Sequence, residues 1–159
     1  MIQIIDNFLP EEEFKSIQFY MIGGEFNWFY QKGAVERDDG QFHMTHMFYQ
    51  PQIGPNSEDL NIWNTFMNRV EAKKCERIKA NLTFKTPTHE STTYHFDYRD
   101  MKTAIFYINT NNGYTEFENG VRVSCVANRV CIFDSNLKHR GTTHTEGDQQ
   151  RIVVNFNYA

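Results

Sequence analysis

Residues 93–98 of the chain read Thr93-Tyr94-His95-Phe96-Asp97-Tyr98, and a run this rich in threonine and aromatic residues favours a β-strand. Because residues i and i+2 of a strand point to the same face, we expect the side chains of His95 and Asp97 to lie side by side. They would supply two ligands of a metal site, and His139 is the best candidate for the third. Two histidines and one carboxylate on one side of a metal, with the other positions open, is the arrangement of non-haem Fe(II) sites.

A second histidine competes with His139 for the third ligand position, because His144 follows the same predicted strand at residues 129–133. His139 comes soon after that strand and is followed by Gly141, which lets the backbone turn directly after the ligand. His144 lies in a run of threonine and charged residues that is typical of an exposed turn. A metal ligand has to be held rigidly, so the sequence favours His139.

The first half of the chain, residues 1–74, combines short strands with two helices. The first helix is predicted to begin near Pro10, because proline and the glutamates that follow suit a first helical turn. The second is predicted to follow Ser57. The expected buried faces are Phe14, Ile17 and Met21 in the first helix and Leu60, Trp63, Met67 and Val70 in the second. Strands are predicted at residues 2–5, 28–30 and 42–49.

The second half of the chain changes to short β runs separated by Gly, Asn and Asp, as in a sandwich or barrel. These runs are residues 77–84, 92–98, 103–109, 114–117, 121–124, 129–133 and 151–158. The fold class is therefore predicted as mainly β, with two helices in the N-terminal half. His43 and His46 are three residues apart on a predicted strand, so they should face opposite sides and not share a metal.

The composition suits one domain with a core of large aromatic side chains, since aromatic residues make up 15% of the 159 residues. The net charge of −4 offers no general attraction to nucleic acid or to an anionic membrane. Three cysteines without metal-type spacing suggest free thiols in a reducing compartment. No membrane-spanning run or signal peptide is recognisable, so a cytoplasmic location is expected.

The order of motifs from His95 onward resembles the 2-oxoglutarate/Fe(II)-dependent oxygenase superfamily, and most of all its prolyl 4-hydroxylase-like branch. The resemblance covers about residues 77–158, and residues 4–10 look like the usual opening of the family. The segments that carry it are 95–97, 103–109, 113–117, 128–134, 139–141 and 151–157. Where the family commonly has Gly-Gly-x-Thr, this chain has Asn112-Gly113-Tyr114-Thr115.

The resemblance implies a double-stranded β-helix, or jelly roll, with Fe(II) bound at one mouth by His95, Asp97 and His139. It implies that Arg151 pairs with the distal carboxylate of the cosubstrate 2-oxoglutarate and that Tyr107 hydrogen-bonds the same group. Arginine suits this role because its guanidinium is planar, charged and bidentate. Asn155 shares the strand face of Arg151 and is a further candidate for cosubstrate binding. Ascorbate is a candidate reductant.

The sequence therefore predicts a single oxygenase domain over residues 1–159, with residues 75–159 as the jelly-roll core that carries the metal site. A peptidyl, prolyl-type substrate is implied by the resemblance alone. A small metabolite or a nucleobase is an alternative, although no basic stripe supports nucleic acid. A non-catalytic jelly-roll binding module is the other alternative. Residues 33–41 are expected to form a flap over the metal site.

Overall fold

The computed structural model describes residues 1–33 and 41–159. Within them the chain forms two antiparallel sheets. The longer sheet has the order β1-β9-β6-β11-β5-β3-β2, with β4 paired to β3, and the shorter sheet has the order β10-β7-β8. The strands of the longer sheet are β1 (Ile2–Ile5), β2 (Phe29–Gln31), β3 (His43–Gln50), β4 (Gly54–Pro55), β5 (Cys75–Phe84), β6 (Lys102–Tyr107), β9 (Arg129–Asp134) and β11 (Gln150–Tyr158). Those of the shorter sheet are β7 (Tyr114–Phe117), β8 (Arg122–Ser124) and β10 (His139–Gly141).

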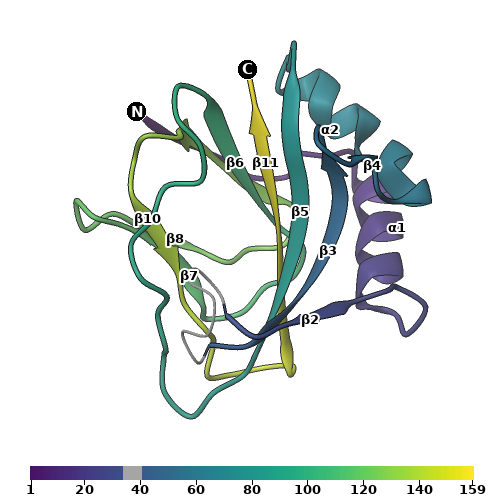
Figure 1. Cartoon of the computed structure of the whole chain (residues 1–159). Helices are drawn as coiled ribbons and strands as arrows, with labels where there is room; N and C mark the ends of the chain where they lie inside the picture. Colours follow the sequence, from purple (N-terminus) through teal and green to yellow (C-terminus); the bar gives the residue numbers. More distant parts are fainter. Residues whose placement is uncertain (34–40) are drawn as a thin grey trace.

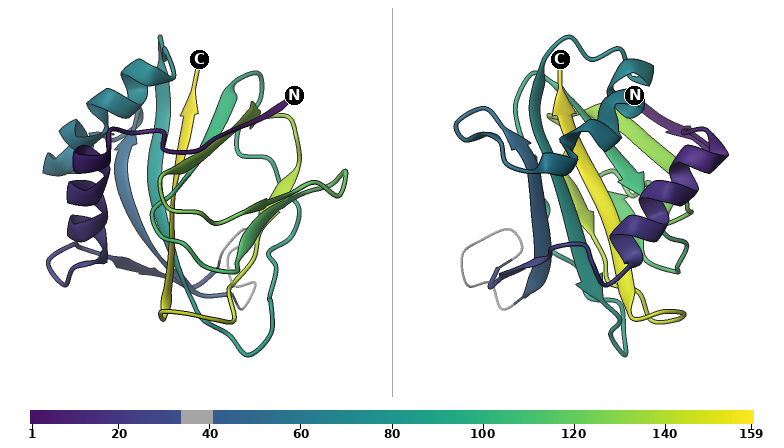
Figure 2. Two further views of the ribbon diagram at one scale, coloured as in Figure 1. Left: turned by 180° about the vertical axis from the view of Figure 1, so that it is seen from behind. Right: turned by 90° about the vertical axis from the view of Figure 1, so that its right-hand side faces the viewer.

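The two sheets face each other as a double-stranded β-helix, and the helices cover the outer face of the longer sheet (Figures 1 and 2). The helices are α1 (Glu11–Ile22), the 3-10 helix η1 (Glu58–Trp63) and α2 (Asn64–Arg69). Aromatic rings fill the space between helices and sheet: Phe66 of α2 stacks on Phe156 of β11 with ring centroids 3.8 Å apart. The predicted mainly β fold with two helical regions is therefore confirmed.

Strand β11 shows how one run of residues serves both the core and the space between the sheets. Ile152, Val154 and Phe156 belong to the core beneath the helices. The alternate residues, Arg151, Val153 and Asn155, line a cavity between the two sheets. This is the alternation expected of a strand, and it places the polar residues of β11 opposite the shorter sheet.

The first predicted helix is confirmed, with Phe14, Ile17 and Met21 buried. The second prediction is only partly right, because the helix begins as the 3-10 turn η1, where the Ser57 hydroxyl accepts a hydrogen bond from the Asp59 amide at 3.2 Å. A 3-10 turn has three residues rather than 3.6. The buried face therefore shifts to Trp63 and Phe66, while Leu60, Met67 and Val70 are only partly buried.

The predicted strand at residues 92–98 is wrong in detail. The segment is extended, but its strand pairing is limited to two isolated bridges, one between Ser91 and Thr142, just after β10, and one between His95 and His139. The Gly141 amide donates to the Thr92 hydroxyl at 3.3 Å, and such side-chain bonds compete with a regular ladder. The partner strand β10, not predicted from the sequence, has three residues and limits how far pairing can extend.

The structure also bears on the predictions about the cysteines, membrane-spanning segments and the flap. Cys75, Cys125 and Cys131 are free cysteines, as predicted. No helix in residues 1–33 or 41–159 is long and apolar enough to cross a membrane. The predicted flap at residues 33–41 falls almost wholly outside the described residues, since 34–40 are not among them.

Candidate metal centre and cavity

The three predicted ligands come together at one side of the cavity between the sheets. One ligand atom each from His95, Asp97 and His139 lies within 4.8 Å of the other two. His139 is held by β10, and His95 is held against it by two backbone bonds: the His95 amide donates to the His139 carbonyl at 3.0 Å, and the reverse bond is 2.9 Å. This pairing fixes the backbones of the two histidines relative to each other.

The hydrogen bonds of both imidazoles leave the Nε2 atoms for a metal. Nδ1 of His95 lies 2.9 Å from the Thr93 carbonyl oxygen, and Nδ1 of His139 lies 3.3 Å from that of Leu137. A carbonyl can only accept, so each Nδ1 must be the protonated donor, and the Nε2 lone pair is then free. Metal-binding histidines are commonly oriented in this way.

The Asp97 carboxylate is oriented by cationic and amide groups behind it. Its Oδ2 pairs with Arg77 of β5 at 2.8 Å and lies 3.4 Å from Nδ2 of Asn157. Its Oδ1 is left facing His95, at 3.9 Å from Nε2. Burial opposes ionisation of this carboxyl, but Arg77, His139 and His95 outweigh it and hold its pKa below the usual range. Asp97 is therefore an ionised oxygen donor.

The His139 ring is nearly inaccessible to solvent, with only 3% of its surface exposed. Burial lowers its pKa, although the neighbouring Asp97 acts in the opposite sense. The ring packs edge-on against Phe133 with centroids 4.9 Å apart. A neutral imidazole held in one orientation is the form that binds a metal, so both its pKa and its packing suit a ligand.

The competing histidine, His144, is not in an exposed turn, and that expectation is wrong. Its side chain is fully buried, and its Nε2 lies 2.7 Å from the Asp148 carbonyl oxygen. It is also outside the group formed by His95, Asp97 and His139. The Thr86 amide donates to the His144 carbonyl at 3.0 Å. This bond holds the turn that contains His144 against the segment that follows β5.

Arg151 enters the cavity from the start of β11 and is 96% buried, with 4% of its surface exposed. Its Nε donates to Sγ of Cys125 at 3.0 Å, and no carboxylate of the described residues forms an ion pair with it. Gly113 allows this placement, because a Cβ there would stand 2.8 Å from Cδ of Arg151. A buried guanidinium without a counter-ion favours binding of an anion.

Tyr107 and Asn155 lie at different depths around the same cavity. Tyr107 is fully buried, and its hydroxyl donates to Oγ1 of Thr115, a cavity-lining residue, at 2.8 Å. Burial raises the pKa of Tyr107, with the thiol groups of Cys125 and Cys131 adding to the effect. Asn155 lines the cavity directly, and its buried Oδ1 has no hydrogen-bond partner.

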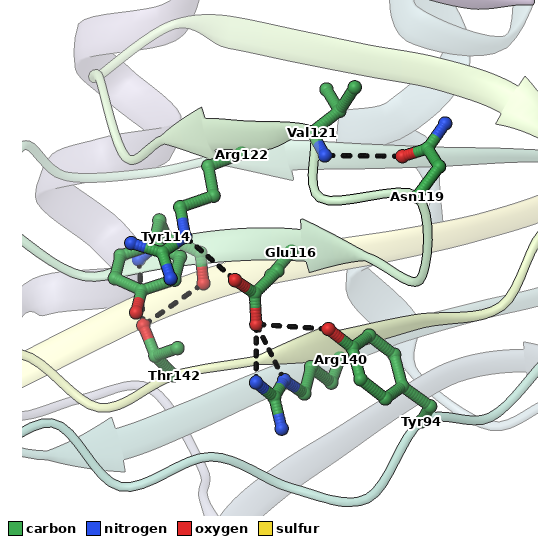
Figure 3. Close-up of polar contacts among 8 residues, drawn as sticks. All are labelled: Tyr94, Tyr114, Glu116, Asn119, Val121, Arg122, Arg140 and Thr142. Atoms are coloured by element: carbon green, nitrogen blue, oxygen red, sulfur yellow. Dashed lines mark hydrogen bonds and ion pairs between the residues drawn. The ribbon is translucent and has the colours of Figure 1, made fainter.

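A buried carboxylate on the outer side of the shorter sheet links the two segments that carry the histidines. Figure 3 shows Glu116 of β7 accepting from Arg140 at 2.8 Å, from Arg122 at 2.7 Å and from Tyr94 at 3.1 Å. We call Tyr94, Glu116, Arg122 and Arg140 the Glu116 cluster. Bonds from Arg140 and Arg122 lower the pKa of Glu116 to about 2. Tyr94 precedes His95 and Arg140 follows His139, so the cluster braces both.

Several residues around the site were not predicted from the sequence. Arg77 and Lys79 alternate with Ile78 and Ala80 on β5 and line the cavity. Their inward direction could have been inferred from alternation in a strand whose other face is apolar. The contact of Cys125 with Arg151 and the pairing within the Glu116 cluster depend on the register of β7, β8 and β10, which no local pattern reveals.

The cavity that these residues share has a volume of about 460 Å³. It reaches from His95, Asp97 and His139 to Arg151, and Phe42, Phe84 and Phe96 lie at its edges. Cavities of this size accept small molecules of up to drug size. A metal and a small organic anion could therefore occupy it together.

Comparison with known proteins gives structural likeness only. The sequence matches no protein-family model, and no curated protein matches it. Among solved structures, one that is similar is the viral collagen prolyl hydroxylase of Paramecium bursaria Chlorella virus-1 in complex with 2-oxoglutarate. It has 14% identity and a TM-score of 0.62, and the alignment covers 98% of this chain and 93% of that one.

Two other similar structures contain different bound molecules. A prolyl hydroxylase from Trichoplax adhaerens, in complex with a peptide of hypoxia inducible factor, has 12% identity and a TM-score of 0.65, covering 99% of this chain and 83% of that one. The epimerase SnoN, in complex with Fe3+, α-ketoglutarate and nogalamycin RO, has 10% identity and a TM-score of 0.69, covering 99% and 78%. The likeness shows that the chain has the jelly-roll fold of 2-oxoglutarate/Fe(II) oxygenases.

Proposed function

We propose that this chain is an Fe(II)- and 2-oxoglutarate-dependent oxygenase that hydroxylates its substrate. The observation that carries the proposal is the pairing, in one cavity, of a two-histidine, one-carboxylate group with a buried arginine that lacks a counter-ion. The first suits Fe(II) and leaves neighbouring coordination positions open. The second suits the far carboxylate of a keto acid.

His95, Asp97 and His139 are the proposed iron ligands, through Nε2, Oδ1 and Nε2. The hydrogen bonds of the two Nδ1 atoms and of Asp97 Oδ2 support this choice of donor atoms. In addition, a buried Asp97 whose pKa is depressed, beside a neutral His139, needs no proton loss at neutral pH to bind a cation.

Arg151 is the proposed partner of the distal carboxylate of 2-oxoglutarate. Cys125 holds its Nε, so the terminal nitrogens remain for the ligand. Tyr107 is proposed to support this end of the site through Thr115, and Asn155 to contact the cosubstrate through its amide nitrogen. When bound, iron would supply the dioxygen chemistry that converts 2-oxoglutarate to succinate and carbon dioxide while the substrate C–H becomes C–OH.

The protein's own part in this reaction is to hold the keto acid in one orientation and to limit water near the reacting atoms. Arg151 and Tyr107 are buried, and Ile105 and Val153 add apolar wall to the cavity. A peptidyl, prolyl-type substrate remains our proposal by resemblance, with small molecules as the alternative, and ascorbate is the proposed reductant. We also propose that the whole of residues 1–159 forms one oxygenase domain working in the cytoplasm.

The test is anaerobic loading of the apo-protein with Fe(II), followed by measurement of 2-oxoglutarate binding and of succinate release in air. The proposal expects one equivalent of metal, binding of 2-oxoglutarate that depends on the metal, and slow succinate release without added substrate. A non-catalytic jelly-roll binding module would show no succinate release. Loss of metal binding in an Asp97→Ala variant, with the fold intact by circular dichroism, would tie the metal to this group.

A further inference from the structure

The floor of the cavity carries a lysine that the proposed metal and cosubstrate sites do not use. Lys79 lies on β5 between Arg77 and Asn81 on the inward face and lines the cavity. Across the sheet its register partner on β11 is Asn155, whose side chain lines the same cavity. Thr83, four positions from Lys79 along β5, is the register partner of Arg151. Lys79 is therefore between the level of Arg151 and that of Arg77 with Asp97.

Lys79 differs from Arg77 and Arg151 in having, among the described residues, neither an ionic partner nor a place in the proposed metal and cosubstrate sites. Arg77 is paired with Asp97 at 2.8 Å, and Arg151 is the proposed partner of 2-oxoglutarate. No carboxylate of the described residues forms an ion pair with Lys79. Burial lowers its pKa to about 8, with Arg77 adding to the effect and Asp97 opposing it. An amine with this pKa is still mostly protonated at neutral pH, so the cavity holds a largely buried cation without a counter-ion.

The side-chain amide oxygen of the neighbouring Asn155 lacks a hydrogen-bond donor among the described residues. Its Oδ1 is buried and accepts no hydrogen bond, and a buried acceptor left unsatisfied is unfavourable. The dianion of 2-oxoglutarate offers only acceptor oxygens and cannot satisfy it. A ligand group with an N–H or O–H donor would satisfy it.

The net charge of the cavity, with Fe(II) and 2-oxoglutarate bound, also favours a second ligand. Arg77, Lys79 and Arg151 contribute three positive charges, and Asp97 contributes one negative charge. Bound Fe(II) and the 2-oxoglutarate dianion would cancel each other, leaving two positive charges on these four residues. Among the described residues that line the cavity, Glu90 is the other acid, and it is exposed. The site therefore favours an anionic second ligand.

We propose that Lys79 and Asn155 form a substrate subsite for a small carboxylic acid with a hydrogen-bond donor beside the carboxylate, the arrangement of α-amino and α-hydroxy acids. The carboxylate accepts from the Lys79 ammonium, and the adjacent N–H or O–H donates to Asn155 Oδ1. This subsite rests on the proposed oxygenase function and favours the small-molecule alternative over a peptidyl substrate. In the proposed function Arg151 and the metal would hold the two carboxylates of 2-oxoglutarate, which would leave Lys79 to the substrate.

The test measures binding before turnover. The wild-type protein is first loaded anaerobically with Mn(II), a redox-inert stand-in for Fe(II), and with 2-oxoglutarate, each followed by calorimetry. A panel of L-α-amino acids and L-α-hydroxy acids is then titrated into the loaded protein, beside the carboxamide of each. We expect at least one acid to bind and its uncharged carboxamide to bind at least about tenfold more weakly, the scale of a hydrogen bond to a charged group.

Variants connect that difference to Lys79. In Lys79→Met the preference for the acid over the carboxamide should disappear, and in Lys79→Arg a preference should return. Lys74→Met is the matched control, since Lys74 is an exposed lysine outside the cavity that pairs with Glu76 at 2.9 Å. It should behave as wild type. Affinity for 2-oxoglutarate should fall less in Lys79→Met than in Arg151→Ala, because Lys79 contributes only to the general positive charge of the cavity and does not contact the cosubstrate.

Each contrary result has a distinct meaning. If Mn(II) or 2-oxoglutarate fails to bind the wild-type protein, the proposed function and this subsite both fall. If both bind but no acid binds, or acids and carboxamides bind equally, the subsite alone is overturned. If Lys79→Met loses affinity for 2-oxoglutarate by a large factor, Lys79 is a contact of the cosubstrate and the substrate assignment is wrong.

Discussion

At the scale of single residues, the clearest expectation concerns the guanidinium of Arg151, which is buried without a counter-ion. Replacing it by alanine should leave metal binding nearly unchanged, because Arg151 is not among the grouped ligand residues. The affinity for 2-oxoglutarate should fall by about 1.5–3 kcal/mol, the contribution of a hydrogen bond to a charged group. Calorimetric titration of 2-oxoglutarate into Mn(II)-loaded protein measures both quantities.

A matched control for Arg151→Ala is Arg129→Ala, which removes an arginine that pairs with Asp6 at 2.6 Å, away from the cavity. That variant should bind 2-oxoglutarate as wild type does. Equal affinity for 2-oxoglutarate in Arg151→Ala and wild type would contradict the assignment of Arg151. An effect of similar size in both arginine variants would indicate a general loss of positive charge instead.

The two histidines of the C-terminal half should separate metal binding from stability. His139→Ala should abolish tight binding of Fe(II) or Mn(II), because it removes one of three ligands. His144→Ala should lower the free energy of unfolding by about 2–4 kcal/mol, as expected when a fully buried ring leaves a cavity. Metal titration below the melting temperature, together with urea unfolding, measures the two effects. A folded His144→Ala protein that does not bind metal would reverse the assignment.

Single residues also show what can and cannot be predicted from a sequence. The sequence predicted one group of residues, namely His95, Asp97, His139 and Arg151. It did so because their motifs follow one another in order, and because ionisable residues within or beside predicted strands suggest a site. The burial of His144 was not predictable, because it depends on bonds from Thr86, distant in sequence, to His144 and Thr143. Lys79 was not recognised either, since a lysine on a strand is usually solvated.

At the scale of elements, the segment that carries His95 and Asp97 is held by few regular contacts. It is not a ladder strand, and its bonds to β10 are those at Thr92 and His95. The Glu116 cluster adds a side-chain brace: Glu116 joins Tyr94 to Arg140, and Arg140 stacks over the Tyr94 ring at 4.3 Å (Figure 3). The distance between the two imidazoles therefore depends on a carboxylate outside the cavity.

Glu116→Gln tests that brace, because glutamine keeps the size of the side chain but removes its charge. We expect affinity for Mn(II) to fall by about 10–100-fold, the usual effect of altering groups that orient metal ligands. The visible spectrum of the Co(II)-substituted protein should also change, because the geometry at the ligands relaxes. A merely structural role for Glu116 would lower stability and leave the spectrum of the folded protein unchanged.

Arg122→Met is the control for this brace, since Arg122 binds Glu116 from β8 and does not adjoin either histidine. It should leave the Co(II) spectrum and Mn(II) affinity near those of wild type. Wild-type metal affinity in Glu116→Gln would show that backbone pairing alone positions His95 and His139. The sequence offered no route to this cluster, because its four members come from four separate segments.

At the scale of the whole molecule, two sheets of unequal length enclose a cavity between them. The face of the longer sheet that packs against the helices is apolar, and the face that lines the cavity carries polar residues. The longer sheet was largely predictable, because alternation on β5 and β11 separates core residues from cavity residues. The shorter sheet was less so, since β8 and β10 have only three residues each and their pairing is set by contacts distant in sequence. The fold therefore places charged groups together that no local pattern connects.

One consequence concerns how stability of the metal-free protein depends on pH. The pKa of Lys79 is lowered to about 8 by burial, from 10.5 for an ordinary lysine. Between these two values the unfolded chain binds more protons than the folded one, so Lys79 makes the free energy of unfolding rise with pH. Two thiols, one partly buried and one buried, act in the opposite sense, because desolvation raises the pKa of Cys75 to about 11 and of Cys131 to about 12.

Because the thiols are common to both proteins, the comparison of wild type with Lys79→Met isolates the lysine. The difference in free energy of unfolding, wild type minus variant, should rise by about 1–3 kcal/mol between about pH 7 and about pH 10.5. Urea unfolding at intervals over this range, without metal, measures it, and Lys74→Met should show no such trend. Parallel curves for wild type and Lys79→Met would mean that Lys79 is as well solvated in the folded protein as in the unfolded chain. The cavity would then not contain the uncompensated buried cation on which the proposed carboxylate subsite depends.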